Sequence, residues 1–392
     1  MQIGWIDFSK EQRSKVLSVL KLLSEPGAVD ELGIGIIRDS FSDILFPGTS
    51  TIQTRAKYFF LIPYLLLELE KDKTIKSHEF LTILSQNEIE LIDILDKDGA
   101  NGVIGVEARD ELKRKPSSIY WNALKTYGFF ANKDLSISEY AKMFCKVRDN
   151  KQNIKNGGNN KRNDEEAADD SDVGSSQTNF WHIPIPKQNW REELSIDLTN
   201  EEARYMYHKI TTTSNTKDSL LALILLQKRL DFCDYNTFAD LDALLPVMPD
   251  LMKNDYIMAR DFAQFIYGAQ IRYNYIFTKG ENEQVNEQWE LWQENIPQID
   301  LDQLFLRLDV RNQNLRHFLK TYQNILSNTL ELDRLIIARE KQLKGASRSK
   351  LFNENLYQYS GKLINMEKLY YRIYNAKRTV GDIFEGLGEV NV

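Results

Sequence analysis

The run from Tyr58 to Leu67 constrains the fold of this chain more than any other stretch, because all ten of its side chains are apolar or aromatic. A helix of this composition has no polar face to turn toward water, so it must be buried on every side. Glu68 and Glu70 end the run well short of the ~18–20 apolar residues that span a bilayer. The sequence therefore predicts a helix at the centre of a water-soluble core.

Elsewhere the chain follows the periodicity of helices. A capping box at Ser9 to Gln12 predicts a helix with an apolar stripe from Val16 to Leu23. Apolar residues at helical spacing predict further helices over Glu79 to Leu95, Asn200 to Ile210, Ser219 to Leu230, Met258 to Ile276 and Leu315 to Leu326. Strand signals are scarce: Phe180 to Pro186 is expected to be extended, and Gly102 to Val106 could form one short strand. The expected fold class is therefore mainly α.

Residues 148–178 interrupt this pattern. Asparagine and glycine dominate the first part of the segment, acidic residues dominate the second, and Ile154 and Val173 are its only substantial apolar residues. Such a segment cannot bury enough apolar surface to offset the entropy that it would lose on ordering. We expect a disordered linker or insertion between two helical lobes, an N-terminal domain over 1–147 and a C-terminal domain over 179–392.

Composition limits the classes of function. The net charge of −7 over 392 residues argues against a protein that coats nucleic acid with its whole surface, but it allows a local basic face. Cys145 and Cys233, the only cysteines, are too few for a disulfide framework or a four-cysteine zinc site, so we expect them to be reduced and buried. The N-terminus shows no basic region followed by an apolar core, and a cytoplasmic location is the default expectation.

A basic segment in the first half precedes a short helix that is bounded by Pro116 and Gly128. A second short helix is expected from Ser138 to Cys145. Two short helices beside basic residues are typical of a small helix-turn-helix-like module, here over 107–146, and equally of a structural helix pair. The residues that would contact nucleic acid are Lys113, Arg114 and Lys115.

The stretch from Arg334 to Arg378 has the opposite charge to the rest of the chain. It holds eleven basic residues against three glutamates, a balance of +8, so that the other residues sum to −15. Basic residues can neutralise phosphates, and the tyrosines that interleave with them can stack on unpaired bases. We expect either a surface for DNA, RNA or another anionic partner, or a solvated face over a tyrosine-rich core. The residues that would form the surface are Lys341, Lys344, Arg348, Lys350, Arg372, Lys377 and Arg378.

The segment from Arg38 to Tyr58 interlocks polar and apolar residues in the order R-D-S-F-S-D-I-L-F-P-G-T-S-T-I-Q-T-R-A-K-Y. Pro47 and Gly48 should break the chain, and Thr49 or Ser50 should cap the helix that follows. The two arginines are expected to pair with nearby carboxylates, namely Asp39, Asp43 or Glu31. The predicted structural motif therefore comprises Arg38, Asp39, Asp43, Thr49, Ser50 and Arg55.

The same motif has a second interpretation. Its hydroxyls, free backbone N–H groups and Arg55 could hold a phosphate. The segment is not a P-loop, because no Gly-Lys-Ser/Thr ending follows the glycine. A structural role is therefore the preferred expectation.

Metal and catalytic patterns are weak in this sequence. None of the four histidines, His78, His182, His208 and His317, lies within helical reach of another or beside cysteines at zinc spacing. Asp39 and Asp43 share a helix face, as a metal-dependent nuclease would need, but no Asp/Glu-x-Lys element accompanies them. We expect no enzyme activity, no cofactor and no bound metal, and a cryptic nuclease centred on these two aspartates is the alternative.

Three stretches together resemble the opening of an uncharacterised bacterial protein family that is known only by a placeholder name. They are Gly4 to Phe8 with the pattern G-W-x-D-F, Asp30 to Gly35, and the F-P-G-T-S-T-x-Q-T-R-A-x-Y motif that ends at Tyr58. The resemblance implies bacterial proteins that occur near helicases and nucleases in genome-defence neighbourhoods. It carries over no functional residues.

Taken together, these patterns predict a non-catalytic accessory or recognition protein of a bacterial defence-type system. Its basic C-terminal face would bind DNA, RNA or a partner protein such as a helicase or nuclease. A purely structural protein–protein scaffold is a further alternative. The nucleic-acid interpretation requires cations that are not already matched by neighbouring carboxylates.

Overall fold

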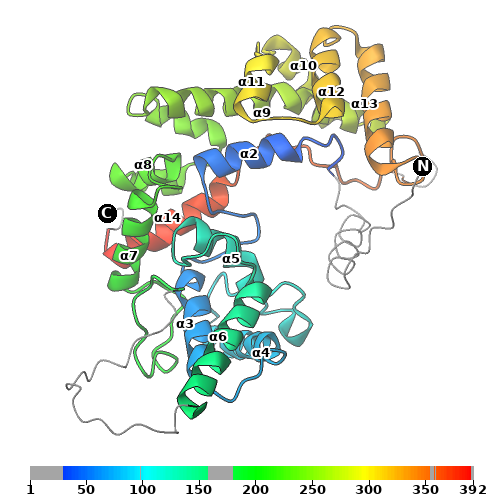
Figure 1. The fold of residues 1–392 in the computed structure, drawn as a ribbon. Coiled ribbons are helices and arrows are strands. Elements are labelled where there is room, and N and C mark those ends of the chain that lie inside the picture. Colours follow the sequence, from blue (N-terminus) through cyan, green and yellow to red (C-terminus); the bar gives the residue numbers. More distant parts are fainter. Residues whose placement is uncertain (1–29, 98, 158–179, 354–356, 358, 390–392) are drawn as a thin grey trace, which may run out of the picture. The chain divides into compact units, whose positions relative to one another are not determined.

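The computed structural model describes residues 30–97, 99–157, 180–353, 357 and 359–389, and within them the chain is mainly helical, as expected (Figure 1). The first family-like stretch and the helix predicted after Ser9 lie outside these residues. The α-helices are α2 (Gly35–Leu45), α3 (Tyr58–Lys71), α4 (Phe80–Leu95), α5 (Pro116–Thr126), α6 (Ile137–Gly157), α7 (Asn200–Thr212), α8 (Leu220–Leu226), α9 (Asp250–Phe277), α10 (Glu283–Glu294), α11 (Leu301–Arg307), α12 (Gln313–Asn324), α13 (Thr329–Lys344) and α14 (Ile373–Leu387). Three 3-10 helices join them: η1 (Arg109–Glu111), η2 (Leu230–Asp234) and η3 (Phe238–Leu244).

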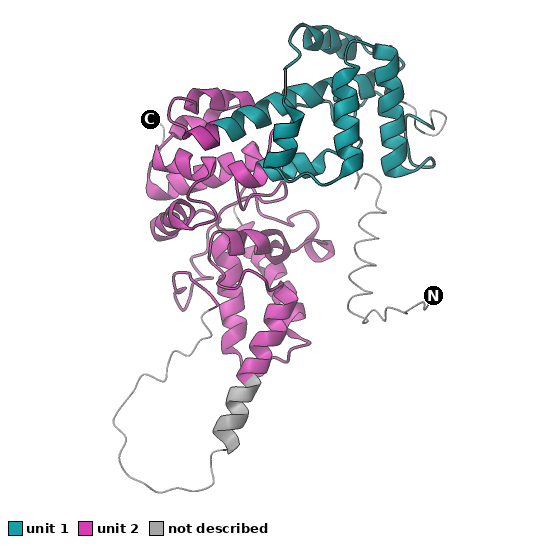
Figure 2. Cartoon of the chain, turned by 45° about the horizontal axis from the view of Figure 1, so that its top comes forward, with its two compact units in different colours: residues 1–41, 254–369 teal, residues 42–253, 370–392 magenta. Residues whose placement is uncertain are grey.

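The chain forms two compact units, which Figure 2 colours separately. Unit 1 consists of residues 1–41 and 254–369, and unit 2 consists of residues 42–253 and 370–392. This division differs from the ranges 1–147 and 179–392 expected from the sequence. Unit 2 combines residues from both sides of the segment 148–178, because Arg55 bonds to Asp382 on α14 and Lys57 bonds to Glu202 on α7.

Helix α3 lies at the centre of its part of unit 2, as its composition predicts. Every residue from Tyr58 to Leu67 is buried. The helix packs against α4 and α5, and the ring of Phe59 meets the rings of Tyr120 and Tyr127 with centroids 5.0 Å apart in each pair. Aromatic pairs at this separation add to the stabilisation from buried area. The prediction of a fully buried helix is confirmed.

Helix α14 packs closely against α7. A Cβ at Gly386 of α14 would lie 2.7 Å from the Cβ of Ala203 on α7, so only glycine leaves room for the two backbones to approach. Helix α7 begins close to its predicted start, at a capping box in which the side chain of Thr199 accepts from the backbone N–H of Glu202. The buried face of α14 includes Ala376, Val380 and Ile383, and its other face is available for contacts outside the core.

Unit 1 is built from α9 to α13 and buries charged groups between its helices. Tyr273 on α9 donates to Glu340 on α13 at 2.6 Å, and Ser349 and the backbone N–H of Leu351 donate to the other carboxylate oxygen of Glu340. Burial would raise the pKa of Glu340, but these hydrogen bonds outweigh it and lower the pKa. Glu340 is therefore held as a charged, fully bonded part of the core.

Three local expectations were wrong. Gly102 to Val106 forms turns, with positive φ at Gly102 and Gly105, and the described residues contain no strand beyond a single bridge between Phe130 and Trp181. Helix α6 continues to Gly157, so the segment from 148 begins as helix, because its first residues include neither glycine nor proline. Helix α8 stops at Leu226, short of the predicted end at Leu230.

None of the helices in the described ranges has the length and apolar content needed to cross a membrane. This agrees with the prediction that the apolar run from Tyr58 to Leu67, which lies in α3, is too short to span a bilayer. The longest of them, α9, carries charged residues along its length.

Gly268 on α9 tests the packing of unit 1. A Cβ at this position would lie 2.3 Å from the ring of Trp292 on α10, and the indole N–H donates to the carbonyl of Gln264, which holds the ring in place. Gly268→Ala is expected to lower the free energy of unfolding by ~1–3 kcal/mol, because the ring cannot move aside without losing its hydrogen bond. Chemical denaturation measures the change.

Gly381→Ala in α14 is the matched control. Its Cβ would lie 3.8 Å from the sulfur of Cys233, which is an ordinary contact. Alanine is the better helix former by ~0.5–1 kcal/mol, so this variant should be no less stable than the wild type. Equal stability of the two variants would contradict the packing described for Trp292.

Candidate functional site

The loop over residues 46–57, between α2 and α3, carries most of the predicted structural motif and is closed by its own hydrogen bonds. Thr49 donates its hydroxyl to the carbonyl of Phe46 at 2.7 Å, and the backbone N–H of Ser50 donates to the side chain of Gln53 at 3.0 Å. Helix α3 begins only at Tyr58, without a side-chain cap. The prediction that Thr49 or Ser50 caps this helix is wrong, because both residues instead hold the turn that ends α2.

Two tyrosines of the α5 region hold this loop. Gly48 has φ of 79°, and a Cβ there would lie 2.6 Å from the ring of Tyr127. The position therefore requires glycine both for its backbone conformation and for lack of space. The hydroxyl of Tyr120 accepts from the backbone N–H of Thr54 at 2.9 Å and donates to the carbonyl of Arg55 at 2.9 Å. The backbone that presents Arg55 is therefore fixed on both sides of the residue.

The guanidinium of Arg55 joins three separate segments. It donates to Asp382 on α14 at 2.8 Å, to Asp197 before α7 at 2.6 Å, and to the carbonyl of Asn101 at 3.2 Å. The side chain of Arg55 is 14% exposed and that of Asp382 only 6%. The predicted partners Asp39, Asp43 and Glu31 are not the ones that the structure provides, since sequence proximity does not reveal partners more than a hundred residues away.

Asp382 accepts a further hydrogen bond, from the backbone N–H of Ala56 at 2.6 Å. Burial raises the pKa of Asp382 to about 6, against the opposing effects of this N–H and of Arg55. Lys57 then donates to Glu202 at 2.7 Å, with both side chains almost completely buried. Glu202 also closes the capping box of α7, so the loop is tied to α7 and α14 by buried charges. Sequence reasoning missed Lys57, Glu202 and Asp382.

The remaining motif residues form ion pairs closer to the surface. Arg38 pairs with Asp39 at 3.1 Å, as predicted. Asp43 pairs with Arg372 at 2.7 Å, and Arg372 also donates to the carbonyl of Thr49 at 2.8 Å. Arg372 was predicted as part of a binding surface, but it has a carboxylate and a carbonyl as partners.

This network is suited to holding structure. Each of the three guanidinium nitrogens of Arg55 already donates a hydrogen bond to an acceptor in the protein. The hydroxyl of Thr49 likewise donates to a carbonyl within its own turn. A phosphate at Arg55 would have to compete with the carboxylates of Asp197 and Asp382, and displacement of the buried Asp382 would be unfavourable because that carboxylate would lose its cation.

Several predicted surface cations of unit 1 are also neutralised. Lys344 contacts Glu31 at 3.0 Å and Glu340 at 3.2 Å, and Lys350 lies 3.6 Å from Glu31. Arg339 is buried and donates to the carbonyl of Leu32. These cations act inside unit 1 and offer little charge to a partner.

Lys341 and Arg348 are the more exposed members of the predicted group in unit 1. The ammonium of Lys341 lies 3.7 Å from the centroid of the Phe352 ring, and Phe352 is itself 49% exposed. Arg348 donates to the carbonyl of Lys344 at 3.1 Å. A cation over an exposed ring remains accessible to an anion on its outer side.

The exposed face of α14 carries the other predicted cations, in unit 2. Lys377, Arg378 and Tyr374 line a hollow of about 450 Å³ together with Leu230, Cys233, Gly381, Phe384, Glu385 and Glu389. Neither Lys377 nor Arg378 forms an ion pair among the described residues, although Lys377 donates to the carbonyl of Tyr235. Tyr374 is 51% exposed, and its ring lies 5.1 Å from that of Tyr370. The structure thus brings two cations and the ring of Tyr374 onto one helix face, and the ring of Tyr370, which precedes α14, packs against that of Tyr374.

The basic residues before α5 do not line this hollow. Lys113 and Arg114 are exposed, and Lys115 is half-buried at the start of α5.

Glu88 on α4 accepts from the backbone N–H of Ser117 at 2.5 Å and from its hydroxyl at 3.0 Å, so a buried carboxyl anchors the first turn of α5. Burial raises the pKa of Glu88 to about 7, although the hydrogen bonds from Ser117 oppose this rise.

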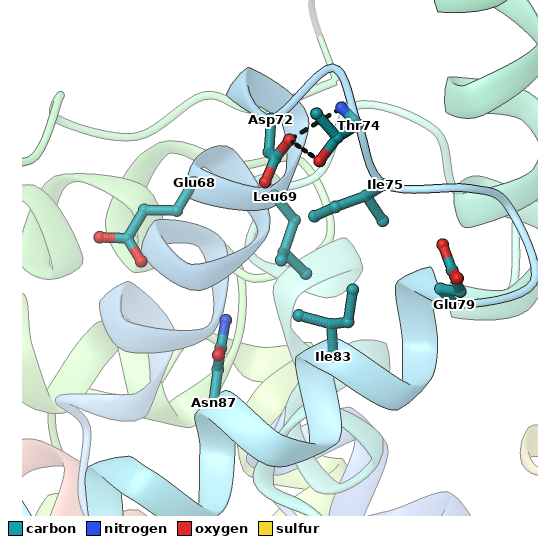
Figure 3. Close-up of a pocket in the computed structure, with 8 residues that line it drawn as sticks. All are labelled: Glu68, Leu69, Asp72, Thr74, Ile75, Glu79, Ile83 and Asn87. Atoms are coloured by element: carbon teal, nitrogen blue, oxygen red, sulfur yellow. Dashed lines mark hydrogen bonds between the residues drawn. The ribbon is translucent and has the colours of Figure 1, made fainter.

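A second hollow in unit 2, of about 470 Å³, has a different character (Figure 3). Its apolar centre is formed by Leu69, Ile75 and Ile83, and its charged rim is acidic: Glu68, Asp72 and Glu79. Carboxylates around an apolar centre would repel phosphate. This hollow is therefore a poor site for nucleic acid and a useful contrast to the one on α14.

The side chains that could hold a metal, and the two cysteines, are the remaining candidates for a chemical role. No group of three or more His, Cys, Asp or Glu side chains there is placed to hold a metal ion. Asp39 and Asp43, the centre of the nuclease alternative, each pair with an arginine. Neither Cys145 nor Cys233 forms a disulfide; Cys145 is buried, as predicted, whereas Cys233 is only half-buried at the hollow on α14.

Comparison with known proteins gives one match. Residues 1–152 match the model of a family described as "Family of unknown function (DUF6361)". No curated protein and no solved structure matches the chain. The match includes Arg55 and Lys57 but not their partners Asp382 and Glu202, so the buried network joins matched and unmatched parts of the chain.

Arg55→Lys tests the network. Lysine keeps the charge but cannot present a planar fork to three acceptors, so Asp382 would be left buried with fewer donors. We expect the free energy of unfolding to fall by ~2–4 kcal/mol. Arg38→Lys, in an exposed pair, should change it by less than ~0.5 kcal/mol. Urea denaturation of both variants gives the comparison, and similar losses would argue against Arg55 as the joining residue.

Glu88→Gln tests the anchor of α5 through the dependence of stability on pH. Because the folded-state pKa lies above the unfolded value of about 4.5, Glu88 binds its proton more tightly in the folded protein. Its contribution to stability is complete below pH ~4.5 and is lost as the pH rises to about 7, by ~3 kcal/mol in total. Denaturation between pH 4.5 and 8 should show the variant gaining stability relative to wild type as pH rises. Parallel pH profiles would contradict the assignment.

Proposed function

We propose that this protein is a non-catalytic recognition protein that binds nucleic acid through the exposed face of α14. The observation that carries the proposal is the hollow beside Tyr374, Lys377 and Arg378, where two cations stand without ion-pair partners among the described residues. Basic side chains gain binding free energy from phosphates by releasing condensed counterions. Cations already paired with carboxylates cannot contribute in this way.

The aromatic residues support the same proposal. Tyr370 lies just before α14 and Tyr374 lies in its first turn, and their rings contact each other. The hydroxyl of Tyr374 donates to the carbonyl of Asn236, which holds an exposed ring in a fixed orientation. A held, exposed ring can stack on an unpaired base without losing much conformational freedom.

Charge distribution explains why this face, and not the whole basic stretch, is proposed. Of the cations predicted from the sequence, Lys344, Lys350 and Arg372 have carboxylate partners. Lys341 and Arg348 remain exposed in unit 1 and could add contacts. The hollow on α14 combines charge, rings and a concave shape.

The biological setting that we propose is an accessory role in a bacterial defence-type complex with a helicase or nuclease. This part of the proposal is supported by the resemblance of the motif around Gly48 and Arg55 to a bacterial family. Copurification with a helicase or nuclease from the native host would test it separately from nucleic-acid binding.

Charge reversal at Lys377 and Arg378 tests the proposal. Filter binding of a single-stranded oligonucleotide should weaken at least tenfold at low salt in the double variant to Glu, because two phosphate contacts become repulsive. The plot of log K against log salt concentration should become shallower by roughly 1.4, from ~0.7 per lost phosphate contact on a single strand.

Lys73→Glu with Lys76→Glu is the matched control. Both lysines are exposed beside the acidic hollow and the double variant changes the net charge by the same amount. It should bind within about twofold of wild type if local contacts govern affinity. No binding by wild type at low salt, or equal losses in the two double variants, would overturn the proposal.

A further inference from the structure

The hollow on α14 has a fixed order of side chains along the helix. Tyr374, Arg378, Gly381 and Glu385 follow one another at intervals of four, three and four residues, so they share one face of the helix. The ring of Tyr374 lies at one end, the cation of Arg378 comes next, then a position without a side chain at Gly381, and the carboxylate of Glu385 ends the row. The row from Arg378 to Glu385 is ~10 Å long at 1.5 Å per residue.

The centre of this row is apolar and open. Gly381 contributes no side chain, and the wall beside it is formed by Cys233, Leu230 and Phe384. A methyl group at Gly381 would lie 3.8 Å from the Cys233 sulfur, so that a small side chain fits and a larger one would fill the hollow. The volume of about 450 Å³ is within the ~300–1,000 Å³ of small-ligand sites.

Charge changes sign across the hollow. Lys377 and Arg378 lie at one end, and Glu385 and Glu389 lie at the other. Glu389 is engaged by Lys228, whereas Glu385 is exposed and in no ion pair among the described residues. A phosphate backbone that followed the whole groove would meet this carboxylate, so a continuous polyanion fits the cationic end alone.

We propose that the hollow holds one unpaired nucleotide, with its phosphate at Arg378, its base over Gly381 and the exocyclic amino group of the base donating to Glu385. This inference rests on the proposed function and names its ligand class: single-stranded nucleic acid, with a preference for bases that carry an amino group. The row of ~10 Å is close to the reach of one nucleotide from its phosphate to the far edge of its base. Tyr374 then stacks on the neighbouring base.

The chemistry of the two ends gives the selectivity. A carboxylate accepts from the amino group of cytosine, whereas thymine presents a carbonyl oxygen at the same place, and two acceptors repel. A duplex keeps its bases paired and stacked, so its base edges cannot enter a hollow of this size. The site should therefore prefer oligo(dC) to oligo(dT), and either single strand to a duplex.

Competition binding with oligo(dC), oligo(dT) and a duplex of equal length provides the test. We expect wild type to bind oligo(dC) about tenfold more tightly than oligo(dT), which is the discrimination of one good base contact. Glu385→Gln should reduce this ratio to about twofold or less, because the amide can also donate to the carbonyl of thymine. Equal binding of oligo(dC) and oligo(dT) by wild type would overturn the inference.

Gly381→Leu and Gly381→Ala separate occupation of the hollow from charge attraction. Leucine fills the space beside Cys233 and should reduce oligo(dC) binding at least tenfold, while alanine should reduce it about threefold or less. Far-ultraviolet circular dichroism and melting confirm that both variants fold. Equal oligo(dC) binding by Gly381→Leu and wild type would place the base elsewhere and overturn the inference.

Cys233 reports occupation directly. It lines the hollow, whereas Cys145 is buried, so alkylation by iodoacetamide at pH 8.5 should modify Cys233 first, and oligo(dC) should slow that reaction at least fivefold. Unchanged alkylation at saturating oligo(dC) would overturn the inference while leaving binding through Lys377 and Arg378 intact. Absence of any binding to oligo(dC), oligo(dT) and duplex would instead overturn the proposed function itself.

Discussion

The guanidinium of Arg55 is the interaction on which the arrangement of unit 2 depends. It bonds to acceptors on α14, before α7 and in the turn at Asn101, and the N–H of the next residue bonds to the same aspartate of α14. A buried ion pair contributes little net stability by itself, but removal of one partner leaves an uncompensated charge in the core. The pairs therefore specify one arrangement of these segments, and they make the C-terminal helix an integral part of a unit that begins near residue 42.

The anchoring of α14 determines which of its residues can meet a ligand. Asp382 faces Arg55, and the helix buries Ala376, Val380 and Ile383 on the same side. Tyr374, Arg378, Gly381 and Glu385 are consequently left on the outer side. The buried network and the proposed binding hollow lie on two faces of a single helix, so the structural motif would hold the proposed binding face in place without itself contacting a ligand.

The helical fold could be predicted from the sequence, because burial and helical periodicity are properties of local stretches. The run from Tyr58 to Leu67 and the helix predicted from Asn200 to Ile210 show this. Helix ends were harder, as at α8, where Lys228 adopts positive φ without being glycine. Composition alone also misjudged the residues after 148, which continue α6.

The candidate site could be predicted only in part. Sequence identified Lys377, Arg378 and Tyr374 as members of a basic and aromatic stretch, but it could not separate them from Lys344 or Arg372, which pair with the distant Glu31 and Asp43. The same limit applied to Arg55, for which nearby aspartates were the expected partners. The fold determines which charges pair over long distances in the sequence. A distant carboxylate that neutralises a cation therefore cannot be recognised from the residues around that cation.

Photo-crosslinking tests the central claim most directly, because it maps contacts without altering the protein. An oligo(dC) strand with one 5-iododeoxycytidine should, on irradiation and peptide mapping, crosslink to peptides that contain Cys233 or Tyr374, and unlabelled oligo(dC) should suppress these crosslinks. Crosslinks confined to the peptides around Lys341 and Phe352, or around Lys113, would contradict the account.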